Sequence, residues 1–307
     1  MSDRTYGVEI ECGHPTNSDG VRGLLAADAK LPAGWSVCCD GSGVEVRTPV
    51  LRGDKGFETL SKMMNLLRDT GGYTTRSDGM HCHFGAEDYI KGPKEALIRV
   101  MESWVNNEAI IQKFVHPYRC KSPMCKKSFT NSSVEYAKNQ DGGIPGGQGA
   151  LTLSNVVTCR TAFKATGRFS TAQPTFEVRL HEGTLDAYEA TGWITMLRAF
   201  LDQCWENVIP PHKKVETFLD ALGIESDARA ALIAKAETRE ERRFGNCPYD
   251  PDAKTKKGYW WCAYYSGAQN YNGCSDWHKD GEPCPKGERD EYCQDGFHGK
   301  HTSAGGV

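Results

Sequence analysis

The sequence lacks the features of a membrane-bound or exported protein. No run of apolar residues is long enough to span a bilayer, and the segment from Met1 to Gly7 is not an apolar leader. We therefore expect a protein of the cytoplasm, or of the host cytoplasm if the source is a virus such as a phage, with no membrane partner.

The sequence also lacks a strong excess of charge of either sign. Lys and Arg number 37 against 40 Asp and Glu, which gives a formal net charge of −3. This balance does not indicate a nucleic-acid partner, although it does not exclude a local basic patch. The 307 residues, 38% hydrophobic and 25% charged, are sufficient for a globular protein with a large core.

Cys-x-x-Cys pairs are absent, although cysteine itself is abundant. The chain has 13 cysteines, an odd number that argues against a complete disulfide framework, so we expect free thiols, with metal binding as the alternative. We interpret the upstream cysteines as small buried side chains, namely Cys12, Cys38, Cys39, Cys159 and Cys204.

The last part of the chain differs in composition from the rest. Residues 244–307 hold 5 cysteines and many Gly, Lys and Asp, which predicts an irregular extension beside a main domain of residues 1–243. Four residues of this extension could bind Zn²⁺ tetrahedrally, namely Cys274, His278, Cys284 and Cys293. Unpaired thiols in a loop-rich segment are an equally compatible interpretation.

Hydrophobic periodicity predicts an α+β fold. Strands are expected at residues 5–11, 43–48, 79–84 and 175–181, and helices at 57–69, 94–115 and 186–208, with shorter charged helices within 213–243. We expect a mostly antiparallel, curved sheet with helices packed on one face.

Residues 118–149 are expected to be irregular. They are either a lid or a plain insertion. Their basic cluster, Arg119 to Lys127, either contacts a nucleotide or an acidic substrate or is a solvated surface.

Each predicted strand has one apolar face and one face of ionisable side chains. Because successive side chains alternate, the polar faces carry Glu9 and Glu11, then Glu45 and Arg47, then His81 and His83, and finally Glu177, Arg179 and His181. A single strand of this kind is usually the solvated face of an ordinary sheet, but four that agree argue against that interpretation.

Carboxylates crowded on one face of a sheet repel one another unless cations offset their charge. Oxygen ligands of this kind suit Mg²⁺, and arginine suits bidentate contact with phosphate. The pattern therefore indicates a site for a divalent cation and a phosphorylated ligand.

Five motifs in order resemble the amidoligase family of the carboxylate–amine ligase superfamily, which includes γ-glutamylcysteine ligase and glutamine synthetase. They are Gly7-Val-Glu-Ile-Glu11, the segment from Trp35 to Asp40, Glu45-Val-Arg-Thr-Pro49, Gly79-Met-His-Cys-His83, and Phe176-Glu-Val-Arg-Leu180 with Gly183-Thr-Leu-Asp186. The resemblance covers roughly residues 5–200 and does not clearly extend to the cysteine-rich part.

The resemblance implies a glutamine synthetase-like catalytic fold with ATP and Mg²⁺. It implies metal ligands at Glu9, Glu11, Glu45, His81, His83 and Glu177, and nucleotide contacts from Arg179, Arg47 and His83. The implied catalytic residues are Glu177, Arg179 on the γ-phosphate, and Asp40, which would position or deprotonate the amine.

The implied reaction joins a small-molecule or peptide carboxylate to an amine through an acyl-phosphate. Two alternatives stay open: a metal-dependent hydrolase that uses the same Glu and His residues, and a non-catalytic binding module stabilised by zinc. Neither substrate can be named from the sequence.

Overall fold

The structure is a computed structural model of the chain. It describes residues 4–29, 31–40, 43–75, 78–121, 125, 129–139, 163–166, 175–224, 226–238, 259–262 and 276–279. The chain divides into two compact units, Met1–Gly245 and Asn246–Val307. In the second unit, β7 (Tyr259–Cys262) and β8 (Asp276–Lys279) form an antiparallel pair.

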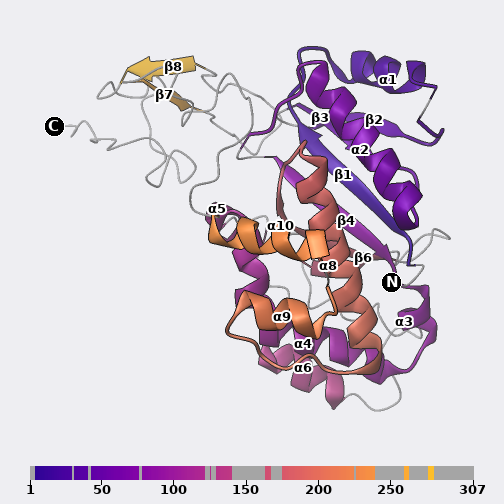
Figure 1. Cartoon of the computed structure of the whole chain (residues 1–307), viewed down its shortest axis with the longest axis vertical. Helices are drawn as coiled ribbons and strands as arrows, with labels where there is room; N and C mark the ends of the chain where they lie inside the picture. The colour runs from indigo at the N-terminus through magenta and orange to yellow at the C-terminus, as the bar shows by residue number, and fades with distance from the viewer. Residues whose placement is uncertain are drawn as a thin grey trace. The chain divides into compact units, whose positions relative to one another are not determined.

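The first unit is built on an antiparallel sheet of six described strands (Figure 1). They are β1 (Tyr6–Cys12), β2 (Ser36–Asp40), β3 (Gly43–Arg47), β4 (Gly79–Gly85), β5 (Phe163–Thr166) and β6 (Thr175–Glu182). Their order is β2-β3-β1-β4-β6-β5, and every neighbouring pair is antiparallel. The α+β prediction is therefore confirmed, and the four predicted strands are the four central ones.

The long predicted helices are also present. They are α2 (Gly53–Asp69), α4 (Lys94–Ile111), which continues into the 3₁₀ turn Gln112–Phe114, and α8 (Ala187–Glu206). The shorter ones are α9 (Val215–Ala221) and α10 (Ser226–Glu237). Helix α8 begins where the Asp186 side chain accepts hydrogen bonds from the amides of Tyr188 and Glu189, which satisfies two donors at the helix start.

Among the described residues, four helices were not predicted: α1 (Ser18–Ala27), α3 (Glu87–Lys91), α5 (Pro117–Lys121) and α6 (Asn131–Lys138). The expectation that residues 118–149 are irregular is therefore wrong for the parts that lie in α5 and α6. Most of the remaining residues of that segment lie outside the described part of the chain, so a lid stays a prediction.

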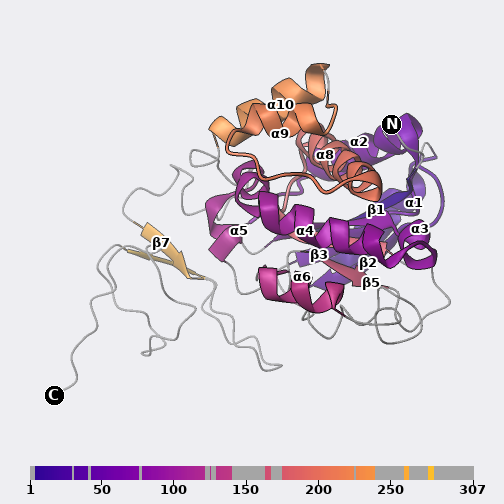
Figure 2. The same cartoon turned by 90° about the horizontal axis from the view of Figure 1, so that it is seen from below.

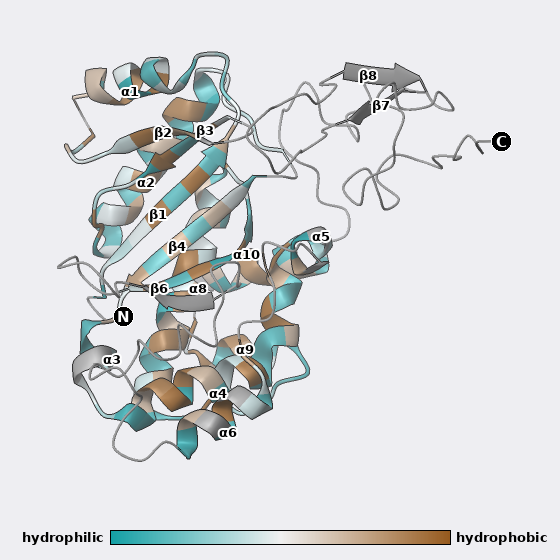
Figure 3. Ribbon diagram, turned by 180° about the vertical axis from the view of Figure 1, so that it is seen from behind, coloured by the Kyte–Doolittle hydropathy of each residue, from teal (hydrophilic) through white to brown (hydrophobic). Residues whose placement is uncertain are grey.

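Helices cover one face of the sheet. Figure 3, turned by 180° from Figure 1, shows β1 and β4 in front of α2 and α8. Val8 and Ile10 of β1 and Val178 of β6 join one apolar core with Leu60 of α2 and Trp193 of α8. Helix α4 packs between α8 and α6 (Figure 2). Within the described part of the chain, no helix is both long and apolar enough to cross a membrane.

A bulge interrupts the pairing of β4 with β6. Cys82 pairs with Val178 and Met80 with His181, so one residue of β4 faces two residues of β6. Beyond the bulge His181 shares the face of Met80, and its ring lies 5.1 Å from that of Trp193 in α8. The prediction that His181 lies beside Glu177 and Arg179 is therefore wrong, because strict alternation along a strand does not survive a bulge.

The cysteines divide by burial. Cys12 and Cys204 are buried as expected, whereas Cys39 is exposed and Cys38 is only partly buried, so the prediction is wrong for these last two. Cys159 lies outside the described residues. The same holds for Cys274, Cys284 and Cys293 and for the side chain of His278 in β8, so the zinc site stays a prediction.

Candidate functional site

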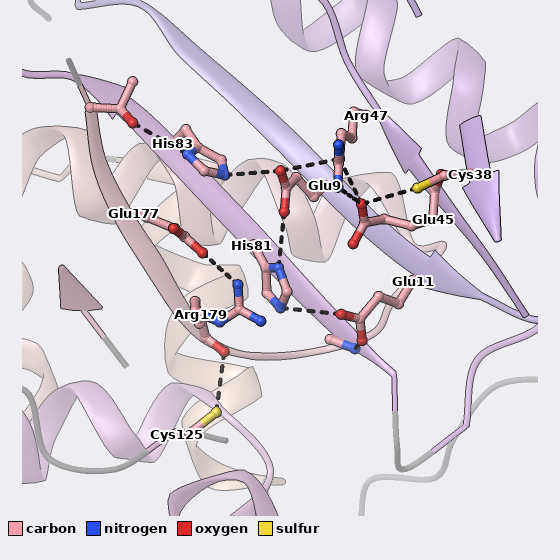
Figure 4. Close-up of polar contacts among 12 residues, drawn as sticks. Glu9, Glu11, Cys38, Glu45, Arg47, His81, His83, Cys125, Glu177 and Arg179 are labelled. Carbon is pink, nitrogen blue, oxygen red and sulfur yellow. Dashed lines mark hydrogen bonds and ion pairs between the residues drawn. The ribbon is translucent and has the colours of Figure 1, made fainter. Parts of the chain in front are cut away.

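The register of the sheet gathers the predicted polar residues on one face (Figure 4). Glu9 stands opposite Arg47 of β3 and His81 of β4, and Glu11 stands opposite Glu45. His83 stands opposite Glu177 of β6. Directly opposed residues of antiparallel strands share a face, so segments far apart in the sequence meet here.

Glu9 lies at the centre of this face. Its carboxylate is 3.2 Å from Nδ1 of His81, 3.3 Å from Nε of Arg47 and 3.5 Å from Nε2 of His83. Burial acts to raise the pKa of Glu9, but the hydrogen bonds from the two histidines outweigh it and lower the pKa well below the usual range. Glu9 is therefore a carboxylate at any pH at which the protein would work.

Glu45 and Arg47 form the β3 side of the site. The Glu45 carboxylate accepts a hydrogen bond from Nε of Arg47 at 2.6 Å and is also contacted by Cys38 Sγ at 3.5 Å. Burial acts to lower the pKa of Arg47, but the charges of Glu45 and Glu9 raise it. Glu45 is only 8% exposed, although Arg47 is largely open to solvent.

Glu177 and Arg179 repeat this arrangement on β6. Nη1 of Arg179 donates to the Glu177 carboxylate at 2.6 Å, and Glu177 is 3% exposed. Among the described residues, Nε of Arg179 is buried and has no hydrogen-bond partner. A buried donor without a partner costs free energy, and an anionic ligand would satisfy it.

Glu11 and His81 adjoin Glu9. The Glu11 carboxylate accepts the backbone N–H of Gly79 at 2.6 Å and lies 3.4 Å from Nε2 of His81. His81 is 2% exposed, and burial lowers its pKa despite its hydrogen bond with Glu9. The imidazole is therefore neutral near pH 7, which is the form that binds metals.

Five of these side chains form two groups with the spacing of metal ligands. Glu9, Glu45 and His81 make one group, and Glu9, His83 and Glu177 make the other, with ligand atoms within 4.8 Å of one another in each. Glu9 belongs to both. Carboxylate oxygens with one imidazole suit a divalent cation such as Mg²⁺ or Mn²⁺.

A third group of this spacing lies on the helix-covered side, where Lys235 of α10 already supplies a cation. It consists of His181, Glu182 and Glu189. The ammonium of Lys235 contacts His181 and Glu189 and lies 3.5 Å from Glu182.

The remaining predicted catalytic residue is Asp40. It ends β2, where it pairs with Gly43, and its side chain lies outside the described part of the structure. Its predicted action on the amine stays a prediction.

Two contacts of this face were missed by sequence reasoning. Cys38 pairs in register with Glu45, and Arg119 of α5 donates to the backbone of Arg179. The pattern Ser36-Val-Cys-Cys-Asp40 has too little alternation to predict a strand, and no sequence signal places the short helix α5 against β6. The sequence marked Arg119 only as the first residue of a basic cluster, a candidate contact for a nucleotide or an acidic substrate.

The site is thus one face of an antiparallel sheet lined by carboxylates, histidines and arginines, the types of side chain that suit a divalent cation and an anionic ligand. The chain belongs to the family described as "Putative amidoligase enzyme", whose model matches residues 16–201. The match includes Glu45, His81, His83, Glu177 and Arg179, and it begins after Glu9 and Glu11.

One similar solved structure is described as "Crystal structure of novel glutamine synthase homolog". It is 10% identical, with a TM-score of 0.40, and the alignment covers 78% of this chain and 66% of that one, just under two thirds of its length. No curated protein matches the chain.

Proposed function

We propose that the protein is an ATP-dependent ligase that joins a carboxylate to an amine through an acyl-phosphate. The observation that carries this proposal is the pair of ligand groups that share Glu9, beside the unpartnered Nε of Arg179. A site for two divalent cations next to a partly buried arginine is suited to the transfer of a phosphoryl group. Membership of the amidoligase family supports the same reaction.

The metal ligands in this proposal are the six predicted ones. Glu9, Glu45 and His81 would hold one Mg²⁺, and Glu9, His83 and Glu177 another. Glu11, which lies against His81, is the sixth. Bound Mg²⁺ would offset the negative charge of the ATP phosphates and of the carboxylates on this face.

The arginines would bind and orient the phosphates. Arg179 is held by Glu177 through Nη1, which leaves Nε free to donate to the transferred phosphoryl group. Arg47, exposed at the β3 side, would contact the nucleotide together with His83. Asp40 would accept the proton of the attacking amine, which must be neutral to act as a nucleophile.

Phosphate release from ATP is the measurement that tests this function. The purified chain with Mg²⁺ and ATP is screened against pools of small carboxylates, peptides and amines. We expect release only when a carboxylate and an amine are both present. Glu177→Gln and Arg179→Lys should each lower turnover by about 100-fold or more, because Glu177 would hold a Mg²⁺ ion and Arg179 would contact the reacting phosphoryl group.

A matched control is Glu135→Gln, on an exposed position of α6, which should keep wild-type turnover. Product formation without ATP would support a metal-dependent hydrolase instead. Zinc in the protein together with an absence of nucleotide binding would support a non-catalytic module. Full turnover in both site variants would contradict the proposed roles.

A further inference from the structure

The backbone of β6 is irregular at Arg179. The bulge leaves His81 of β4 opposite both Arg179 and Leu180. On the other side of β6, the last described pair with β5 joins Val178 to Phe163. Within the described sheet, Arg179 therefore pairs in regular register with neither neighbour. Bulges of this kind re-aim a side chain and are frequent next to active sites.

Two side chains from outside the sheet contact the carbonyl oxygen of Arg179. Nη2 of Arg119, in α5, donates to it at 2.7 Å. Sγ of Cys125 donates to it at 3.3 Å (Figure 4). A carbonyl that leaves the ladder inside a protein needs such partners, because burying it unpaired costs free energy. Within the described structure, Arg119 and Cys125 thus supply the hydrogen bonds to this carbonyl.

Gly79 leaves room for Arg119 on this face. A Cβ at position 79 would lie 2.8 Å from Nη2 of Arg119 and 3.0 Å from Nε2 of His81. Residues 79 and 81 share a face of β4, so the Arg119 guanidinium reaches the carboxylate face. Any larger residue at position 79 would push the guanidinium away from the Arg179 carbonyl.

The segment that carries Arg119 is itself fixed to β6. The backbone N–H of His116, just before α5, donates to the Glu182 carboxylate at 2.9 Å. Arg119 is 4% exposed and Cys125 is also 4% exposed, so neither is a mobile surface group. The contacts therefore join α5 and the residue before it to β6, at the bulge and beyond it.

We infer that Arg119 and Cys125 are positioning residues that hold the bulged backbone of Arg179 and thereby set where its guanidinium points. The role of Arg179 in this inference, contact with a phosphate, rests on the proposed function. The contacts of Arg119 and Cys125 with the Arg179 carbonyl are made without any ligand. Arg119 is therefore a buried residue that contacts the site, and it is not part of a solvated basic surface.

The first test observes Arg179 directly. In the full chain labelled with ¹⁵N-arginine, the Nε–H resonance of Arg179 is identified by its loss in Arg179→Lys. We expect this resonance to shift in Arg119→Gln, in Cys125→Ala and in Gly79→Ala. Cys125→Ser keeps a donor and should restore the wild-type position. Cys120→Ala, in the same helix as Arg119, is the matched control, because Cys120 Sγ contacts the carbonyls of Gln112 and His116 instead.

The second test measures the binding of MgATP and MgADP by calorimetry. Arg119→Gln should weaken MgATP binding about tenfold and MgADP binding by no more than about twofold, because only the terminal phosphate would depend on Arg179. Cys125→Ala should have a smaller effect in the same direction, since a thiol is a weak donor.

An Arg179 resonance that stays in place in folded Arg119→Gln and Cys125→Ala would overturn the inference, as would an equal shift in Cys120→Ala. Weaker MgATP binding with an unmoved resonance would also overturn it, because Arg119 would then act on the nucleotide directly. If Arg119→Gln does not fold, the position of the Arg179 resonance in Cys125→Ala and Gly79→Ala tests the inference. If the wild type binds no MgATP, the proposed function fails while the resonance still tests the positioning contacts.

Discussion

Glu9 connects the two halves of the candidate site. It is the one residue common to both ligand groups on this face of the described structure, and it contacts side chains from β3 and β4. Its lowered pKa keeps it charged, so it would accept a cation without first losing a proton. A change at Glu9 should therefore affect both metal positions, whereas a change at Glu45 should affect one.

Manganese binding tests this difference. Mn²⁺ prefers the same ligands as Mg²⁺ and is counted by electron paramagnetic resonance. We expect two bound ions in the wild type, one in Glu45→Gln, and neither ion at the wild-type affinity in Glu9→Gln. Glu135→Gln should match the wild type. An equal loss of bound Mn²⁺ in Glu9→Gln and Glu45→Gln would contradict the proposal that Glu9 is a ligand of both ions.

Most residues of the site were predictable because they sit on strands with strict alternation. Glu9, Glu45, His81 and Glu177 alternate with apolar residues that the core buries, and antiparallel pairing then brings them together. Arg119 could not be found this way. Its contact depends on a tertiary approach of α5 to β6 and on the missing side chain of Gly79.

At the scale of elements, α10 is fixed to the sheet by buried charge. Lys235 contacts His181 of β6 and Glu189 of α8, and it lies 3.5 Å from Glu182. Burial and the charge of Lys235 lower the pKa of His181 to about 4, so the imidazole stays neutral near pH 7. The ammonium of Lys235 therefore offsets the buried carboxylate of Glu182 and the partly buried one of Glu189.

Removing this ammonium should destabilise the protein. Lys235→Met leaves Glu182 and Glu189 without their cation, and we expect the free energy of unfolding to fall by about 3 kcal/mol or more. Arg229→Met, which removes an exposed ion pair with Asp220 in the same region, should cost less than about 1 kcal/mol. Urea denaturation measures both values, and equal losses would contradict the anchoring role of Lys235.

The elements that the sequence did not predict have weak local patterns. β2 and β5 are edge strands of the described sheet, with five and four residues. The side chains of β2 do not alternate clearly between polar and apolar, and β5 is too short for its alternation to stand out. Helices α3 and α5 are five residues each, too short for helical periodicity to register. The bulge at Arg179 left no sequence signal either, which is why the position of His181 was predicted wrongly.

At the scale of the whole chain, the family match and the candidate site coincide only in part. The match spans residues 16–201, so it includes β3, β4 and β6 but neither β1 nor the second compact unit. Glu9 and Glu11 therefore join the site through pairing in the sheet, which the structure supplies. Zinc binding by residues 244–307 stays a prediction.

In the proposed reaction, a carboxylate becomes an acyl-phosphate before it meets the amine. The most direct measurement follows an oxygen atom from ¹⁸O-labelled carboxylates, supplied as pooled amino acids and dipeptides with amines, Mg²⁺ and ATP. Attack on the γ-phosphate carries one carboxylate oxygen into the released phosphate. We predict one ¹⁸O atom in each phosphate released. Phosphate without the label, or amide products made without ATP, would contradict the account.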